Sequence, residues 1–145
     1  ALQPRYNLLF RQAERDLLPF CGALGIGVMP YNPLGAGMLT GKYRRGSPPP
    51  PESRFGWGDY GRMYQGRYWS DEMFDVVEAL VAVAGEEGIT PAQTALGWLL
   101  SHQAITSPIV GATRPEQLRD SVLALEKGLS EAAIKRLDEA SRTFL

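Results

Sequence analysis

Residues 31–43 read Tyr-Asn-Pro-Leu-Gly-Ala-Gly-Met-Leu-Thr-Gly-Lys-Tyr, and this stretch indicates the fold more strongly than any other. It follows a short apolar run, residues 26–29, that is typical of a buried strand. Its glycines let backbone N–H groups approach an anion closely, and Lys42 adds a positive charge. In α/β folds, ligands bind where a strand passes at its carboxyl end into such a loop. The stretch therefore predicts an α/β fold with a loop that holds a phosphate-bearing cofactor.

The composition is that of an ordinary globular domain. The chain has 145 residues, of which 44% are hydrophobic and 21% charged, and its net charge is −1. This balance argues against a nucleic-acid partner or an anionic membrane surface. No apolar run approaches the roughly 18 residues that span a bilayer. The single cysteine, Cys21, excludes an internal disulfide and a cysteine-rich metal site. We expect a cytoplasmic protein without a bound metal.

Hydrophobic periodicity and turn signals predict strands that alternate with helices. Strands are expected over 2–6, 26–31 and 106–111, and helices over 14–24 and 71–87. Two capping boxes, which begin at Thr90 and Thr113, and a cap at Ser130 predict three further helices. A long irregular segment, 34–69, is expected between strand and helix because it contains four consecutive prolines.

This alternation is typical of a parallel sheet built from βαβ units. Three parallel strands with two open edges make a poor isolated domain. The chain also starts at Ala1, within an expected strand. We therefore expect part of a larger α/β barrel or open sheet, in which residues 1–145 form a single segment.

Several motifs, in this order and spacing, resemble the aldo-keto reductase superfamily. The resemblance is strongest to its bacterial branch and to the related β-subunits of voltage-gated potassium channels. The motifs are Gln3-Pro-Arg-Tyr-Asn-Leu-Leu9, Tyr31 to Gly37, Thr40-Gly-Lys-Tyr43, Ser53-Arg54, Thr90 to Trp98 and Ile109 to Leu118. The resemblance implies a (β/α)8 TIM barrel, of which this chain is the C-terminal half: about three parallel strands, outer helices and a long βα loop, with the N-terminal half absent.

The resemblance also implies a reaction, in which NADP(H) exchanges a hydride with the carbonyl carbon of an aldehyde or ketone. The family's catalytic Asp, Tyr, Lys and His lie on earlier strands, so no residue of this chain is assigned a catalytic role. His102, at an expected helix end, does not align with the family's histidine. The chain alone is predicted to be inactive, and the N-terminal half or another chain would be its partner.

The nicotinamide and diphosphate contacts carry over from the resemblance. Gln3 would bond the carboxamide, and Tyr31 would stack on the nicotinamide ring. Lys42 and Arg54 would bring positive charge to the phosphates. The diphosphate would lie along the loop formed by Asn32, Pro33, Leu34, Gly35 and Gly37.

The adenosine contacts are implied in the same way. Gly111 and Thr113 would receive a phosphate at a helix N-terminus, and Gln117, Asp120 and Ser121 would lie over adenine and ribose. Three positions depart from the family pattern: Asn32 stands where Ser is usual, Ser121 where many members have Asn, and Ala112 where some branches have a basic residue. NADPH is favoured over NADH, because Lys42, Arg54 and Arg114 can compensate.

Plainer interpretations exist for the same residues. The glycine-rich loop is also compatible with an ordinary surface loop, and Tyr31 with simple packing. The aromatic residues between 55 and 69 fit either a loop packed on its own barrel or a wall of the substrate pocket. Two alternatives to an enzyme remain: a non-catalytic NADPH-binding regulatory module, and a half barrel that dimerises to bury Val28 and Ile109.

Overall fold

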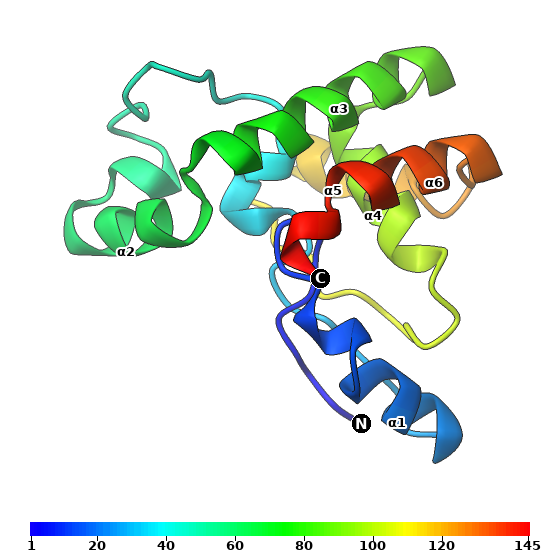
Figure 1. Cartoon of the computed structure of the whole chain (residues 1–145). Coiled ribbons are helices and arrows are strands. Elements are labelled where there is room, and N and C mark those ends of the chain that lie inside the picture. Colours follow the sequence, from blue (N-terminus) through cyan, green and yellow to red (C-terminus); the bar gives the residue numbers. More distant parts are fainter.

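The computed structural model describes all residues, 1–145, and it is mostly helical (Figure 1). The α-helices are α1 (Leu17–Ala23), α2 (Gly58–Tyr68), α3 (Asp71–Glu87), α4 (Pro91–Leu100), α5 (Pro115–Leu123) and α6 (Glu131–Ala140). Four short 3-10 helices complete the list of elements: η1 (Gln12–Glu14), η2 (Gly35–Thr40), η3 (Arg54–Gly56) and η4 (Arg142–Phe144). The predicted helices over 71–87 and after Thr90 and Ser130 are confirmed.

The predicted fold class, half of a TIM barrel with three parallel strands, is wrong, because the structure contains no strand. The segments expected as strands meet only in isolated parallel bridges: Leu2 with Val28, Arg5 with Tyr31, Val28 with Ile105, and Tyr31 with Ile109. Each segment contains a proline, Pro4, Pro30 or Pro108, which has no N–H to donate to a ladder. The hydrogen bonds therefore occur singly, as from Tyr31 N to Pro4 O at 3.0 Å.

The predicted irregular segment over 34–69 is wrong for 58–68, where helix α2 forms despite three glycines. Gly61 is required for close packing: a Cβ there would lie 2.4 Å from the carbonyl oxygen of Phe55. The side-chain amide of Gln65 donates to that same oxygen at 2.8 Å. Contact with η3 thus stabilises a helix whose local propensity is poor.

The core lies around α4, which is buried along the whole of residues 92–99. Trp98 and Leu99 of α4, Leu80 of α3 and Leu137 of α6 are fully buried. Helix α3 packs against both α4 and α6, and Figure 1 shows α3 and α6 running side by side. A helix that is apolar on every side is stable only when other elements surround it. Helix α4 therefore forms the centre of the molecule.

Capping interactions fix where two of these helices begin. Thr90 Oγ1 accepts from Gln93 N at 3.2 Å, and Gln93 Oε1 accepts from Thr90 N at 3.3 Å, so the first capping box is confirmed. Ser130 Oγ accepts from Ala133 N, as predicted for α6. The capping box predicted at Thr113 is wrong, because α5 begins one residue later and its N-cap, Arg114, makes no side-chain cap.

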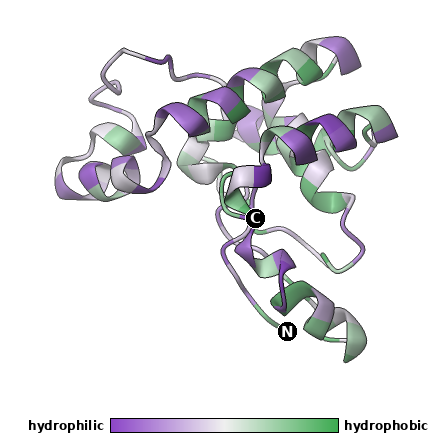
Figure 2. Ribbon diagram, viewed as in Figure 1, coloured by the Kyte–Doolittle hydropathy of each residue, from purple (hydrophilic) through white to green (hydrophobic).

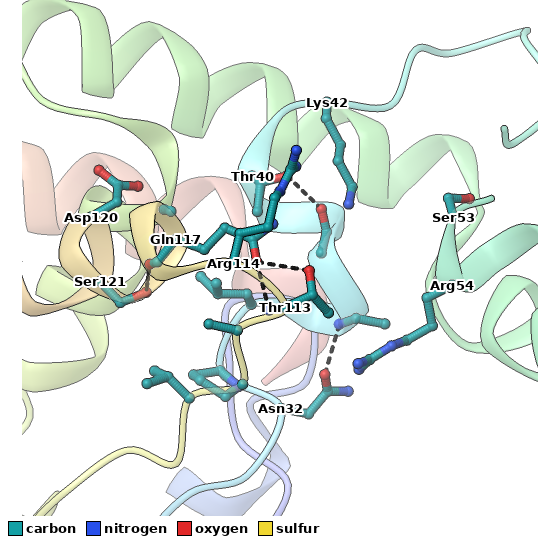
Figure 3. Close-up of a pocket in the computed structure, with 18 of the residues that line it drawn as sticks. Asn32, Thr40, Lys42, Ser53, Arg54, Thr113, Arg114, Gln117, Asp120 and Ser121 are labelled. Atoms are coloured by element: carbon teal, nitrogen blue, oxygen red, sulfur yellow. Dashed lines mark hydrogen bonds between the residues drawn. The ribbon is translucent and has the colours of Figure 1, made fainter.

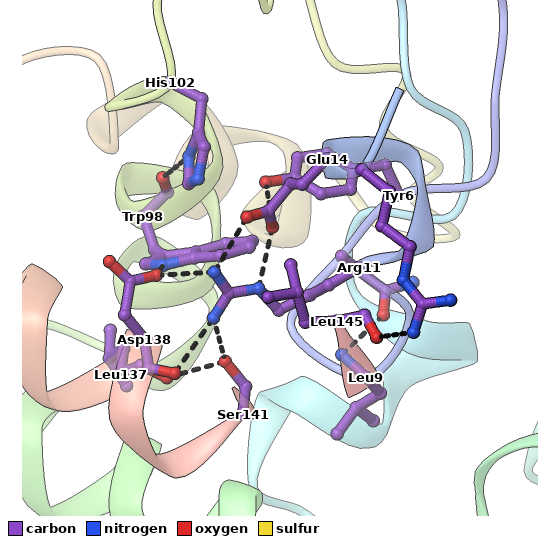
Figure 4. A network of polar contacts seen from close by, with 12 residues as sticks. Tyr6, Leu9, Arg11, Glu14, Trp98, His102, Leu137, Asp138, Ser141 and Leu145 are labelled. Carbon is purple, nitrogen blue, oxygen red and sulfur yellow. Dashed lines mark hydrogen bonds and ion pairs between the residues drawn. The ribbon is translucent and has the colours of Figure 1, made fainter. Parts of the chain in front are cut away.

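A polar network joins the N-terminal region to α4 and α6 (Figure 4). The guanidinium group of Arg11, almost fully buried, donates to Glu14 at 2.7 and 2.9 Å and to Ser141 Oγ at 2.7 Å. Its Nη2 also lies 3.0 Å from Asp138 Oδ1. The phenol of Tyr6 donates to Glu14 at 2.8 Å. Opposite charges and hydrogen bonds together satisfy this buried cation.

The surface retains apolar side chains at two places. Helix α1 lies apart from α3, α4 and α6 in Figure 1 and is largely hydrophobic in Figure 2. Phe20 in this helix and Leu24, which follows its last residue, are 57% and 61% exposed. Helix α5 exposes Leu118, Val122 and Leu123. None of the helices combines the length and hydropathy that a membrane span requires.

Candidate functional site

A pocket of about 690 Å³ lies between the 31–42 segment and α5 (Figure 3). Its other walls come from η3 and α2 and from the first residues of α4. This volume is within the range of pockets that hold small molecules and cofactors. Segments far apart in the sequence therefore combine to form one cavity.

Most residues predicted to bind the cofactor line this pocket. They are Tyr31, Asn32, Pro33, Leu34, Gly37, Lys42, Arg54, Gly111, Thr113, Gln117, Asp120 and Ser121. Gln3 and Gly35 do not line it. Gly35 is buried beneath the loop, where an added Cβ would contact Leu9 at 3.4 Å, and Gln3 is exposed on the N-terminal segment.

The loop takes its shape from Asn32, which has a positive φ of 59°. Asparagine tolerates this left-handed conformation better than most residues. Its Oδ1 accepts from Ala36 N at 2.7 Å, and its Nδ2 donates to the hydroxyl of Tyr68 at 2.9 Å. Asn7, fully buried, donates to the backbone oxygen of Asn32 at 2.9 Å. The side chain of Asn32 thus links the loop at Ala36 to Tyr68.

Burial raises the pKa of Tyr68 above its ordinary value, although hydrogen bonds from Asn7 and Asn32 act in the opposite direction. The phenol therefore stays neutral at physiological pH and serves as a hydrogen-bond partner for both asparagines. Because Tyr68 is the last residue of α2, this contact fixes the end of that helix against the loop.

Positive charge predominates around the pocket. Lys42, Arg54, Arg67 and Arg114 line it, and none of them has a carboxylate oxygen within 4.0 Å. Only two carboxylates line it, those of Glu52 and Asp120. Unpaired cations beside a cavity favour an anionic ligand.

Lys42 reaches the glycine-rich loop because Gly37 has no side chain. A Cβ on Gly37 would lie 3.3 Å from the ammonium nitrogen of Lys42, and the φ of Gly37 is +94°. The same nitrogen lies 5.0 Å from the centre of the Tyr43 ring. The hydroxyl of Tyr43 is buried without a hydrogen-bond partner. This corner of the pocket therefore places a cation beside backbone that a ligand can approach closely.

The opposite wall is α5, whose polar side chains are held by local hydrogen bonds (Figure 3). Gln117 Oε1 accepts from the backbone N of Thr113 at 2.8 Å and from its hydroxyl at 3.1 Å. Ser121 donates to the backbone oxygen of Gln117 at 2.9 Å. Gln117 therefore closes the first turn of α5 and keeps its amide nitrogen available to a ligand.

Sequence reasoning did not assign several pocket residues to the site. Ser53 and Arg67 line the pocket beside η3 and α2. Ser53 belongs to the Ser53-Arg54 motif but was not assigned a contact, and Arg67 gave no signal because α2 was not predicted. Trp57 and Tyr64, from the aromatic cluster, also line this pocket, whereas the role of the cluster as a wall of the substrate pocket stays a prediction. His102 lies elsewhere, where its Nδ1 is 3.0 Å from the backbone oxygen of Trp98.

Comparison with known proteins identifies the protein family to which this chain belongs. The profile of the Aldo/keto reductase family matches residues 1–142, which is nearly the whole chain. The chain belongs to the aldo-keto reductase superfamily, as the sequence motifs predicted.

Individual relatives differ in their names. A probable voltage-gated potassium channel subunit beta of Arabidopsis thaliana is 37% identical over 86% of this chain and 38% of its own length. Aflatoxin B1 aldehyde reductase member 2 of Rattus norvegicus is 32% identical over 91% of this chain and 39% of its own length. The chain thus spans about two fifths of the curated relatives it matches.

Among solved structures, a glycerol dehydrogenase from Gluconobacter oxydans superposes on the whole of this chain with a TM-score of 0.78. The chain covers 43% of that protein, and the sequences are 23% identical. This similarity establishes the fold. The helices and extended segments have the same arrangement as part of that glycerol dehydrogenase.

Proposed function

We propose that this chain binds NADP(H) in the pocket of Figure 3 and forms the cofactor-binding part of an oxidoreductase that reduces aldehydes or ketones. The observation that carries the proposal is the set of four unpaired cationic side chains around a cavity of about 690 Å³. NADP(H) is a large polyanion, so both the size and the charge of the pocket suit it. Family membership supports the same choice.

The residues divide between the two ends of the cofactor. Lys42 and Arg54 neutralise the diphosphate beside Gly37, where the backbone is open to close approach. Tyr31, 41% exposed at the pocket edge, offers its ring to the nicotinamide. The bound cofactor supplies a hydride for a carbonyl carbon, and the residues of this chain bind and orient it.

The adenosine end lies against α5. The backbone at Gly111 and Thr113 leads into the N-terminus of that helix, and the N-terminus of a helix favours a phosphate. Arg114 provides the charge for a 2′-phosphate and gives NADPH its advantage over NADH. Gln117 and Ser121 present polar groups to the adenine and ribose.

Fluorescence titration of the purified chain with NADPH and NADH tests this proposal. We expect Lys42→Met and Arg54→Met each to weaken NADPH binding by about tenfold, because a hydrogen bond to a charged group is worth about 1.5–3 kcal/mol. Arg44→Met is the matched control, since Arg44 is exposed and does not line the pocket. Equal effects of all three substitutions, or no binding by the wild type, would reject the pocket as the cofactor site.

The alternative is a regulatory module that binds NADPH without turnover. One observation favours it: several relatives are named as potassium channel subunits. Incubation of the NADPH-bound chain with simple aldehydes, in the presence of the partner half that supplies the family's catalytic residues, separates the two functions. Oxidation of NADPH that depends on the carbonyl compound supports the reductase, whereas tight binding without oxidation supports the regulatory module.

A further inference from the structure

Helix α5 has little apolar packing to hold it in place. None of its residues is buried, and Leu118 and Val122 are each 49% exposed. Its main contact is with α4. Yet α5 provides one wall of the pocket through Thr113, Gln117 and Ser121. Something other than hydrophobic burial must therefore fix the position of this wall.

A polar contact to α4 meets that need. The hydroxyl of Thr90 donates to Asp120 Oδ2 at 2.9 Å, and the amide of Gln93 donates to Asp120 Oδ1 at 2.7 Å. Both carboxylate oxygens are thus engaged by the first turn of α4. In Figure 3 the carboxylate of Asp120 points away from the side chains of Gln117 and Ser121. Asp120 thus lines the pocket while both of its carboxylate oxygens contact the neighbouring helix.

The two donors belong to the start of the central helix, α4. Thr90 and Gln93 form the capping box of α4, the helix at the centre of the core. The hydroxyl of Thr90 accepts from Gln93 N and donates to Asp120, while Gln93 uses its oxygen for the cap and its nitrogen for Asp120. One set of side chains therefore caps α4 and binds α5.

We propose that Asp120 is a positioning residue, which with Thr90 and Gln93 anchors α5 to α4 and so places the pocket wall that receives the adenosine end of a dinucleotide. The consequence for the ligand rests on the proposed NADP(H) function, whereas the anchoring of α5 does not. The charge-assisted hydrogen bonds supply the attraction, and the capping box of α4, of which Gln93 is buried, holds the two donors in place.

The substitution Gln93→Glu separates anchoring from capping. Glutamate keeps a side-chain oxygen at the third helical position, which completes the capping box as well as glutamine does. It replaces the donor that faces Asp120 with a second carboxylate, so an attractive contact becomes a repulsive one. Thr90→Ser retains both hydroxyl contacts. Ser130→Ala, at the cap of α6, removes a comparable cap far from the pocket.

Hydrogen exchange of the α5 amides, measured on the full chain without ligand, tests directly whether α5 is anchored to α4. We expect Gln93→Glu to reduce protection in α5 by about tenfold and Asp120→Asn to do the same, since each removes a hydrogen bond that involves a charge. Thr90→Ser and Ser130→Ala should leave α5 unchanged. 2′,5′-ADP represents the adenosine end of the cofactor alone. In the variants, its affinity should fall in proportion to the fraction of molecules in which α5 is held against α4.

Unchanged exchange of α5 in both Gln93→Glu and Asp120→Asn would overturn the proposal. Loss of protection throughout the molecule in Gln93→Glu, with Asp120→Asn like wild type, would also overturn it, because the effect would then lie in α4. A wild-type chain that fails to bind 2′,5′-ADP would reject the proposed function, and the exchange data would still decide the anchoring.

Discussion

Arg11→Met is predicted to destabilise the protein strongly. The guanidinium group of Arg11 is almost fully buried and contacts Glu14, Asp138 and Ser141 (Figure 4). Methionine keeps the aliphatic part of the side chain, but it removes the guanidinium group, whose Cζ lies 5.1 Å from the centre of the Trp98 ring, and leaves two carboxylates without their cation. Removing one partner of a buried ion pair costs about 3–5 kcal/mol. We expect about 3 kcal/mol, because the side chains of Glu14 and Asp138 are 17% and 39% exposed.

The same network predicts how stability depends on pH. Burial alone would raise the pKa of Glu14, but hydrogen bonds from Arg11 and Tyr6 and the charge of Arg11 outweigh it and lower the pKa below its ordinary value. A carboxyl group with a lowered pKa in the folded state stabilises the protein above its unfolded pKa. That stabilisation is lost as the pH falls through the folded pKa. Arg11→Met should therefore lose less stability on acidification than the wild type.

Urea unfolding at neutral and acidic pH measures both effects. Arg45→Met is the matched control, because Arg45 also contacts three carboxylates, Asp71, Asp75 and Glu78, but lies at the surface. Surface ion pairs contribute little, so the free energy of unfolding should hardly change. If Arg11→Met and Arg45→Met behaved alike, or if Arg11→Met kept the full acid sensitivity of the wild type, the assignment of the network would be refuted.

Three further substitutions are expected to change stability, each measurable by urea or thermal unfolding. Tyr43→Phe should stabilise the free chain by about 1 kcal/mol, because it removes a buried hydroxyl that has no partner; a loss of stability would show that the hydroxyl is satisfied. Gly41→Ala should destabilise by about 1–2 kcal/mol, since φ is +70° and the new Cβ would lie 2.8 Å from Val81; a neutral result would contradict this backbone conformation. Ser130→Ala should cost about 1 kcal/mol through the lost cap of α6, and no loss would mean that the cap is replaced by solvent.

Agreement between sequence and structure is best where local interactions decide. The capping box at Thr90 and the cap at Ser130 involve atoms three residues apart, and both helices form as predicted. Helix α3 has the predicted bounds, because its apolar periodicity and the stop at Gly88 are local signals. Disagreement appears where distant segments meet. Helix α2 depends on contact with η3, and the missing strands depend on hydrogen bonds between segments that each contain a proline.

The sequence by itself determined the family, the glycine-rich loop and the identity of twelve pocket-lining residues, because ordered motifs and turn chemistry are readable along the chain. Only the tertiary structure decided that Arg67 joins the pocket, that Gln3 does not, and that Asp120 turns toward α4. The physical reason is the range of the interactions. Caps and turns act between near neighbours, whereas a pocket wall and a buried ion pair require contacts across many residues of chain.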